Sequence, residues 1–126
     1  MEFPKNVKYT EDHEWIRVEG ATAYVGITDY AQDQLGEIVF VDVDTEGATI
    51  EKNKTFGSIE AVKTVSELLM PVTGLVVKVN GDLEDQPELV NSDPYKDGWI
   101  IEIEVKDASQ LDSLLTADQY RSFIGQ

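Results

Sequence analysis

One lysine stands out among the residues of this 126-residue chain that could do chemistry. Lys63 lies in the segment GSIEAVKTVSELLMPVTG, residues 57–74, and its neighbours are mostly small or aliphatic. A lysine offers a primary amine at the end of a flexible four-carbon stem. Lys63 is therefore either an ordinary solvated lysine or the residue on which the function depends.

The segment EDHEW, residues 11–15, holds a second group of reactive side chains. Its carboxylates belong to Glu11, Asp12 and Glu14, and they surround the only histidine of the chain. A metal site usually needs several ligands in suitable geometry, and the chain has neither a second histidine nor a cysteine. We therefore expect His13 to be a structural or surface residue. By itself, this segment is also consistent with a solvated turn.

The sequence does not favour an enzyme in its own right. The absence of cysteine excludes disulfides, thiolate metal sites and a cysteine nucleophile, and it fits a reducing compartment. The sequence contains no nucleophile–base constellation, phosphate-binding loop or metal-ligand cluster. No spacing singles out a pair of carboxylates for acid–base chemistry.

The net charge is −15, from 25 acidic and 10 basic residues. Nucleic-acid binding requires a basic footprint, which this chain lacks, and anionic membrane surfaces are disfavoured for the same reason. The charge favours partners with basic docking surfaces, or it simply keeps an abundant protein in solution. No apolar run approaches the ~18 residues of a membrane span, and no signal or transit peptide is visible. The cytoplasm is therefore the expected location.

The elements that must position these residues form one β-rich domain over residues 1–126, since this length matches a single domain. Five stretches alternate in polarity or are rich in β-branched and aromatic residues. They cover residues 13–20, 21–27, 36–43, 74–82 and 98–105. Residues 81–98 are expected to form a long loop, and Trp15 and Trp99 to be packing residues.

Short helices are expected at three places. Thr28 can cap a helix over DYAQDQL that stops at Gly36. Thr116 and Gln119 have the spacing of a capping box at the start of a C-terminal helix. On that helix one face is shared by Tyr120, Phe123 and Ile124. Residues 107–115 could add another turn or two.

The stretch around Lys63 is ambiguous by local rules alone. Ser58 could cap an amphipathic helix that ends at Pro71. The competing interpretation is two strands joined by a turn near Val62 and Lys63, but that turn contains no glycine or asparagine. Periodicity leaves both structures open.

The same stretch resembles the lipoyl-attachment segment of the glycine cleavage system H-protein family. The family pattern has a glycine, an acidic residue three positions before the lysine, a small or aliphatic flank and a later Pro-x-x-Gly. In this chain these residues are Gly57, Glu60, Val62, Lys63, Pro71 and Gly74. Three further segments resemble H-protein segments in order and spacing: YTEDHEW at 9–15, GITDYAQDQLGEIVFVDV at 26–43 and LVNSDPYKDGWI at 89–100. Together the four cover most of the chain.

The resemblance implies a fold that is mostly β, the barrel-sandwich hybrid of lipoyl and biotinyl carriers, with a few short helices including a C-terminal one. The lysine would lie on a hairpin. We therefore expect strands at about residues 55–61 and 65–70 in place of the local helix, since tertiary context often overrides local propensity.

The resemblance also implies a non-catalytic carrier of the glycine cleavage system, with lipoate linked to Lys63 as an amide. The lipoyl group would accept an aminomethyl group from a pyridoxal-phosphate glycine decarboxylase. A tetrahydrofolate-dependent aminomethyltransferase would remove it, and a flavin-containing dihydrolipoyl dehydrogenase would reoxidise the dithiol with NAD. Such a cofactor brings its own reactive chemistry, which suits a chain without cysteine.

The resemblance assigns roles to residues beside the lysine. Glu60 is expected to be a recognition contact for the lipoate ligase or lipoyl/octanoyl transferase that must choose Lys63 among the lysines. Val62 and Thr64 flank the attachment residue. Asp12 and Glu14 are expected to hold the basic amine of the loaded arm, although family members often have a hydroxyl residue where Asp12 stands. The family also implies a monomer.

Four alternatives differ from this interpretation in what they require. Biotin carriers usually have methionine on both sides of the lysine, where this chain has Val62 and Thr64. Lipoyl domains of 2-oxo-acid dehydrogenases commonly have Asp before the lysine and Ala after it. An H-like protein that relays lipoate to other enzymes would share the same motif. An acidic β-rich interaction domain would carry no covalent modification.

Overall fold

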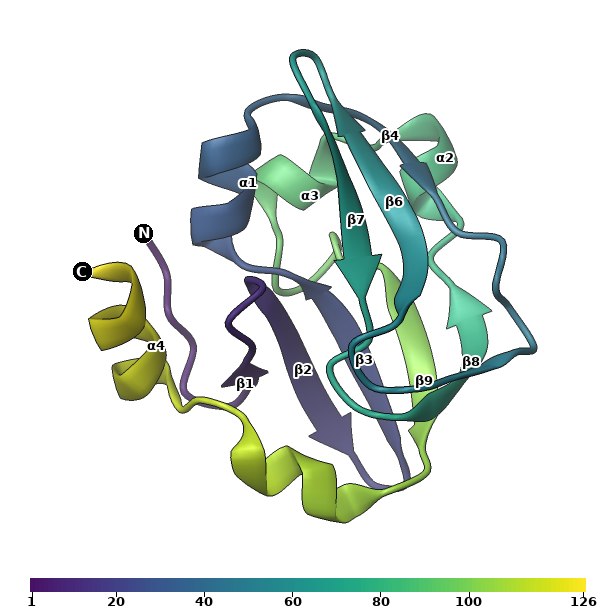
Figure 1. Ribbon diagram of the computed structural model, residues 1–126. Helices are drawn as coiled ribbons and strands as arrows, with labels where there is room; N and C mark the ends of the chain where they lie inside the picture. Colours follow the sequence, from purple (N-terminus) through teal and green to yellow (C-terminus); the bar gives the residue numbers. More distant parts are fainter.

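Two antiparallel sheets make up most of the molecule (Figure 1). The computed structural model describes residues 1–126. The strands are β1 Lys8–Tyr9, β2 Glu14–Glu19, β3 Thr22–Ile27, β4 Ile38–Asp42, β5 Thr49–Ile50, β6 Thr55–Ala61, β7 Val65–Leu69, β8 Gly74–Val79 and β9 Ile101–Val105. The larger sheet has the order β1-β2-β3-β9-β8-β5 and the smaller one the order β4-β6-β7. The expected mostly β fold is thus confirmed.

The five stretches expected as strands from their composition all contain one. β2 and β3 pair as the expected hairpin, and Gly20 at their turn has a φ of 71°. Two further strands, β1 and β5, were not expected. Each is only two residues long, which is too short for an alternating pattern to be recognised.

The helices expected at residues 29–35 and near the C-terminus are present. They are α1 Asp29–Leu35 and α4 Ala117–Ile124, and between β9 and α4 lies the 3₁₀ helix η1 Ala108–Ser113. The Thr28 hydroxyl accepts a hydrogen bond from the Ala31 N–H. Thr116 and Gln119 form the complete reciprocal capping box. Both caps therefore follow directly from the sequence.

One expectation about these segments was wrong. Residues 81–98 are not a plain loop, because they contain the single-turn helices α2 Asp82–Asp85 and α3 Leu89–Ser92. On α4 the three residues expected to share a face are not equally buried: Tyr120 is fully buried and Phe123 is 49% exposed. The short helix packs on β1 through Tyr120, whose ring stacks on that of Tyr9 with centroids 4.7 Å apart. Phe123 lies beyond this contact.

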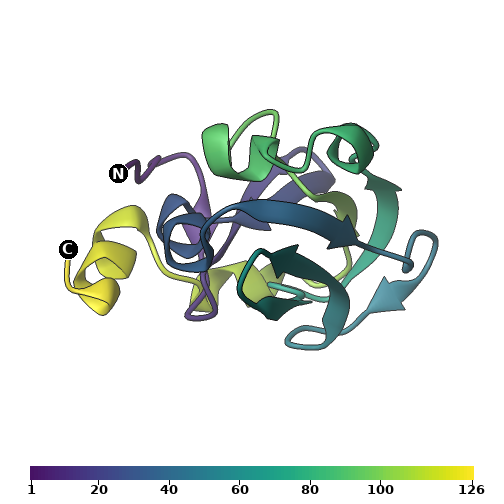
Figure 2. The same cartoon turned by 90° about the horizontal axis from the view of Figure 1, so that it is seen from above.

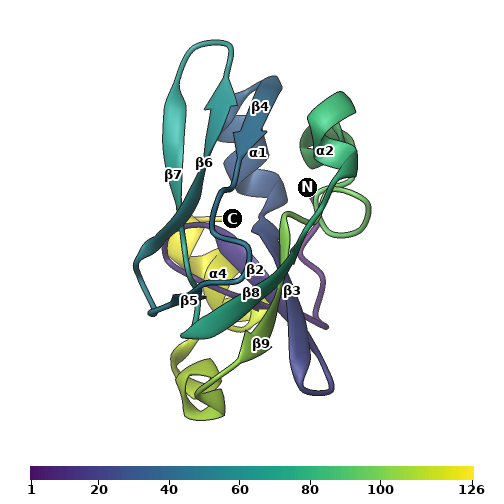
Figure 3. The same cartoon turned by 90° about the vertical axis from the view of Figure 1, so that its right-hand side faces the viewer.

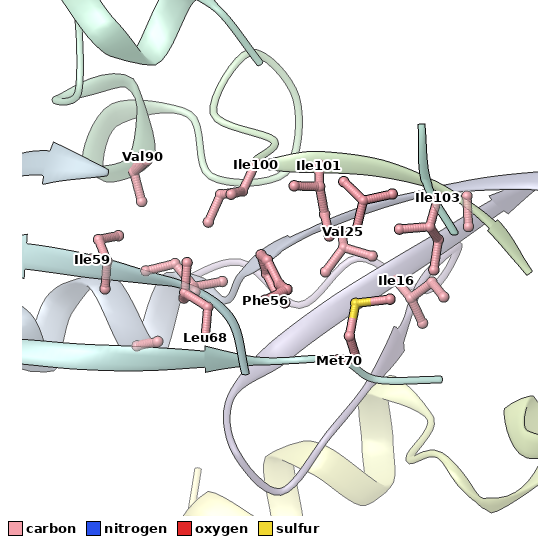
Figure 4. Packing of buried hydrophobic residues seen from close by; sticks show 14 of the residues in the cluster. Ile16, Val25, Phe56, Ile59, Leu68, Met70, Val90, Ile100, Ile101 and Ile103 are labelled. Carbon is pink, nitrogen blue, oxygen red and sulfur yellow. The ribbon is translucent and has the colours of Figure 1, made fainter. Parts of the chain in front are cut away.

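The main core lies between the two sheets, and Figure 4 shows how their side chains meet. The smaller sheet contributes Ile59 and Leu68, and the larger sheet contributes Val25, Ile101 and Ile103; all five are at most 2% exposed. A second cluster joins β1, β2 and α4, with fully buried Trp15 among its members. Trp99 is half-buried against it, so both tryptophans are packing residues as expected.

The hairpin of β6 and β7 projects beyond the rest of the molecule, and α1 lies beside β7 (Figure 1). Figure 3 shows β4, β6 and β7 side by side as one small sheet. The two chain ends lie on a common side of the molecule, away from the hairpin tip (Figure 2). None of the helices has the length and apolar character needed to cross a lipid bilayer.

Candidate functional site

Lys63 lies at the tip of the projecting hairpin, in the turn of residues 62–64 that joins β6 to β7. The Ala61 N–H donates to the Thr64 carbonyl at 2.8 Å, which closes the turn. The Val62 N–H donates to the Glu37 carbonyl at 3.1 Å, which ties the tip to the residue before β4. The Lys63 side chain is exposed and takes part in no hydrogen bond or ion pair. Its amine is therefore free on a fixed backbone.

The turn explains why local sequence rules were ambiguous here. No residue from 62 to 64 has a positive φ, so the turn requires no glycine or asparagine. The helix that Ser58 could have capped does not form, because β6 is the central strand between β4 and β7. Its inward side chains, Ile59 and Ala61, are buried. The two strands expected from the family resemblance are confirmed as β6 and β7.

Two glycines of the family pattern are required by close backbone approaches. A Cβ on Gly57 would lie 2.6 Å from the Asp42 carbonyl oxygen of β4. A Cβ on Gly74 would lie 2.9 Å from the Glu104 carbonyl oxygen of β9. Real Cβ atoms do not approach backbone oxygens this closely, so both positions need glycine for the strands to pair.

The residues flanking the lysine lie on the surface. Val62 and Thr64 are exposed on either side of Lys63 in the turn. Glu60 is exposed on β6, where it lies opposite Val65 of β7. Its carboxylate makes no hydrogen bond or ion pair, so it is available to a partner close to the tip.

A cleft of about 280 Å³ lies between α1, β7 and the turn that precedes β2. Half of its lining residues are hydrophobic. They include Ile27, Leu35 and Leu68, from β3, α1 and β7 respectively. The structure places both acidic residues singled out in the sequence here: Asp12 is exposed on the turn, and Glu14 is buried in the wall.

Glu14 is held from two sides. Its Oε1 accepts a hydrogen bond from the Thr10 hydroxyl, and its Oε2 accepts one from the Leu69 N–H, both at 3.0 Å. Burial raises the pKa of Glu14 from its ordinary value of 4.5 to about 8, although both hydrogen bonds oppose that rise. The charge of Asp12 raises the pKa a little further. Glu14 is therefore a buried acid that a nearby cation would ionise.

Glu67 also borders the cleft and was not singled out in the sequence, but its carboxylate lies on the outer face of the small sheet. It is exposed on β7, and its Oε2 lies 3.3 Å from the Thr55 hydroxyl that donates to it. Spacing along the chain could not have found this residue, because the cleft brings together β7 and the turn before β2. The one usable signal in the sequence was the expected hairpin, because a strand in this stretch has to lie beside other elements of the fold.

His13 is a structural residue, as expected. It adopts a φ of 69°, and its Nδ1 lies 2.9 Å from the Tyr120 hydroxyl. That hydroxyl lies 2.8 Å from the hydroxyl of Thr28, the cap of α1. Burial lowers the pKa of His13, which favours a neutral ring in this chain of hydrogen bonds. No group of three or more His, Asp or Glu side chains is placed to hold a metal ion.

Comparisons with known proteins agree in one family. A family model described as "Glycine cleavage H-protein" matches residues 7–126. Glycine cleavage system H proteins of Brevibacillus brevis and Bacteroides fragilis are each 59% identical over 124 residues, covering 98% of this chain and of the relative. The crystal structure of a glycine cleavage system H protein from Mycobacterium marinum superposes with a TM-score of 0.89 at 36% identity. It covers 98% of this chain and 99% of its own.

Proposed function

Because the chain belongs to the glycine cleavage H-protein family, we propose that Lys63 is the residue through which it carries a lipoyl group. The chain is the lipoyl-bearing shuttle of the glycine cleavage system. In that role it takes an aminomethyl group from the decarboxylase to the aminomethyltransferase and electrons to dihydrolipoyl dehydrogenase. When bound, the lipoyl group supplies the disulfide that accepts both.

The single observation that carries the assignment is the unpartnered amine of Lys63 on a projecting, hydrogen-bonded turn. An acylating enzyme needs an amine that it can enclose without first breaking an ion pair or unfolding a strand. Two of the other seven lysines differ in this respect, and the remaining five have free amines but lie outside the hairpin turn. Lys106 pairs with Glu104 at 2.7 Å, and Lys52 donates to the Ser113 hydroxyl at 2.8 Å. A rigid base under a flexible stem also fits a tether that must reach several active sites.

The cleft beside β7 is suited to receive the loaded end of such an arm. Its hydrophobic residues would cover the apolar chain and limit the access of water. Two carboxylates, those of Asp12 and Glu14, would face the cationic amine. Glu14 lies deepest and is already fixed by two hydrogen bonds. We assign Glu14 the main role in holding the amine, and the exposed Asp12 a weaker one.

The finer parts of the proposal are those that the composition and the family resemblance lead us to expect. The chain acts as a non-catalytic, monomeric carrier in the cytoplasm, with lipoate amide-linked to Lys63. A lipoate ligase or a lipoyl/octanoyl transferase attaches the group, and Glu60 is one of its recognition contacts. The partner enzymes carry pyridoxal phosphate, tetrahydrofolate and FAD with NAD, and the chain supplies binding and orientation.

Peptide-resolved mass spectrometry of the protein from cells supplied with lipoate tests the attachment site. We expect a lipoyl mass increment only on the peptide that contains Lys63, and none in Lys63→Arg. Lys54→Arg removes another exposed lysine next to the same hairpin and should keep the increment. Glycine-dependent loading of the modified protein then separates glycine cleavage from other lipoyl carriers. A folded, unmodified protein in the presence of an active ligase would overturn the proposal.

A further inference from the structure

The outward surface of the small sheet carries an exposed apolar row beside Lys63. Phe40 of β4 lies opposite Glu60 of β6, and Glu60 lies opposite Val65 of β7. Residues directly opposite each other on neighbouring strands share one face of the sheet. Phe40 is 52% exposed and Val65 is 62% exposed. Glu60 therefore lies between two large apolar side chains that the core does not use.

Two further apolar side chains extend this row. Val62, in the turn, is 65% exposed, and Val39 is exposed at the irregularity in β4 where the pairing with β6 shifts. Together with Phe40, Glu60 and Val65 these two residues make a set of five, which we call the outer hairpin face. Half of the eight large hydrophobic side chains that the whole molecule exposes lie here. A concentration of this kind on one face is typical of a binding surface.

The surroundings of the outer hairpin face are acidic. A cleft of about 500 Å³ between β4, β8 and α2 includes Phe40 and has three charged residues, all of them carboxylates: Asp42, Glu46 and Glu84. A neighbouring cleft of about 580 Å³ includes Val39 and holds four carboxylates: Glu37, Glu84, Asp85 and Glu88. Neither cleft contains a lysine or arginine. A partner that covers the apolar row must therefore bring positive charge to its rim.

We propose that the outer hairpin face is the docking surface of the enzyme that attaches the lipoyl group to Lys63. The inference rests on the proposed function. The partner is a protein with an apolar recess that receives Phe40 and Val65, a donor for the Glu60 carboxylate and a rim of lysine and arginine. In this geometry the Lys63 amine enters the partner's active site beside the recess.

The attaching enzyme is favoured as the partner over the enzymes that act on the lipoyl group, because it acts on the short, unmodified lysine side chain. An attaching enzyme must bring its acyl donor to an amine only four methylenes from the backbone. It therefore has to close on the residues next to Lys63. Enzymes that act on the far end of a lipoyl arm stand further from the turn and need fewer of these contacts. Glu60, Val62 and Val65 lie within three residues of Lys63, and Phe40 lies opposite Glu60 on the neighbouring strand, where the first kind of contact falls.

Steady-state lipoylation by a purified lipoate ligase, with lipoate and ATP, tests the proposal. The ligase first transfers the AMP of ATP to the lipoate carboxylate and releases pyrophosphate; the Lys63 amine, having lost a proton to solvent, then forms the amide and displaces AMP. Phe40→Ser and Val65→Ser should each lower kcat/KM about tenfold, mainly through a higher KM, because each removes an apolar anchor from the centre of the contact. Raising the salt concentration should also raise KM for the wild-type protein.

Matched controls come from exposed apolar residues elsewhere. Phe123→Ser on α4 removes a phenylalanine that is 49% exposed, and Val77→Ser on β8 removes a valine that is 40% exposed. Both should be lipoylated at the wild-type rate. Circular dichroism and urea denaturation of every variant establish that the docking variants remain folded.

The outcomes separate this inference from the function on which it rests. If wild-type Lys63 is modified and only the Phe40 and Val65 variants are lipoylated more slowly, the proposed function and the docking surface are both supported. Equal rates for all four serine variants overturn the docking surface while Lys63 remains the attachment site. If wild-type Lys63 is not modified by an active ligase, the proposed function fails and the docking surface falls with it. As a second test, the Phe40 and Val65 variants, once lipoylated, should differ less from wild type in the reduction of the lipoyl disulfide by NADH and dihydrolipoyl dehydrogenase than in lipoylation. If the variants differed more from wild type in reduction than in lipoylation, the argument from the length of the lysine side chain would be contradicted.

Discussion

The carboxylate of Glu14 accepts a hydrogen bond at 3.0 Å from the backbone N–H of Leu69, 55 residues further along the chain. The bond joins β2 of the large sheet to the last residue of β7, whose other end leads to the Lys63 turn. Glu14 is only 2% exposed, so this is a buried acceptor on a buried acid. One side chain therefore fixes the wall of the cleft and faces its interior.

The raised pKa of Glu14 predicts a particular dependence of stability on pH. Between its ordinary pKa of 4.5 and its folded-state pKa of about 8, the folded protein binds more protons at this group than the unfolded chain does. The contribution of Glu14 to the free energy of unfolding is present at low pH and is lost as the pH rises through this window, by at most about 1.4 kcal/mol per pH unit. We expect Glu14→Gln to remove this decline in urea denaturation between pH 5 and 8. Glu11→Gln, at an exposed residue of the same turn, should retain it; equal slopes in both variants would contradict the assignment.

The loaded arm should be less well sheltered when Glu14 is neutralised. A hydrogen bond to a charged group is worth about 1.5–3 kcal/mol, so Glu14→Gln should speed ammonia release from the loaded protein about tenfold or more. Release is measured without aminomethyltransferase, because then only hydrolysis of the arm contributes. Asp12→Asn should have a smaller effect, since Asp12 is exposed. If Asp12→Asn had the larger effect, Glu14 would be a residue of the cleft wall without a role toward the arm.

The close approach at Gly57 predicts a steric cost for the smallest side chain. In Gly57→Ala the new Cβ would meet the Asp42 carbonyl at 2.6 Å and the Val43 side chain at 2.8 Å, so β4 and β6 would have to separate. We expect a loss of about 1–3 kcal/mol in the free energy of unfolding. Gly81→Ala is the control, because nothing lies within 4 Å of that Cβ and its φ is −65°. Chemical denaturation compares the two, and a Gly57 variant as stable as the Gly81 variant would refute the steric argument.

Thr28 should contribute to stability through two bonds that can be separated. Its hydroxyl accepts the Ala31 N–H that caps α1 and also lies 2.8 Å from the Tyr120 hydroxyl on α4. Thr28→Val keeps the shape and removes both, so it should cost about 1–2 kcal/mol. Thr28→Ser keeps both and should cost less, while Tyr120→Phe keeps the cap but removes the bond to Thr28 together with the bond to the Nδ1 of His13. If Thr28→Val cost no more than Thr28→Ser, the two bonds of the Thr28 hydroxyl would contribute nothing measurable.

Much of the fold could be predicted from the sequence because local and global preferences agree there. Thr28 and Thr116 have cap-forming side chains, and Gly36 at the end of α1 has a φ of 81°, so both helices carry start signals that need no tertiary context. The strands of the large sheet alternate clearly. The hairpin of β6 and β7 is different: its apolar residues fit a helix as well, and only its place between β4 and the core decides.

In the candidate site, too, some residues could be predicted from the sequence and others could not. Lys63, Glu60, Asp12 and Glu14 could be named from sequence because each lies in a segment that resembles a family motif. Glu67 could not, since its place on the cleft depends on β7 lying beside the turn before β2. The outer hairpin face was also missed. Its members come from β4, β6 and β7, and only the strand register brings them together.

Both ends of the chain lie away from the hairpin tip (Figures 1 and 2). A molecule attached to a sensor surface through either terminus would therefore present Lys63 to the solution in the same orientation. Immobilisation by the first residue and by the last can then serve as replicates in binding measurements with each enzyme of the system.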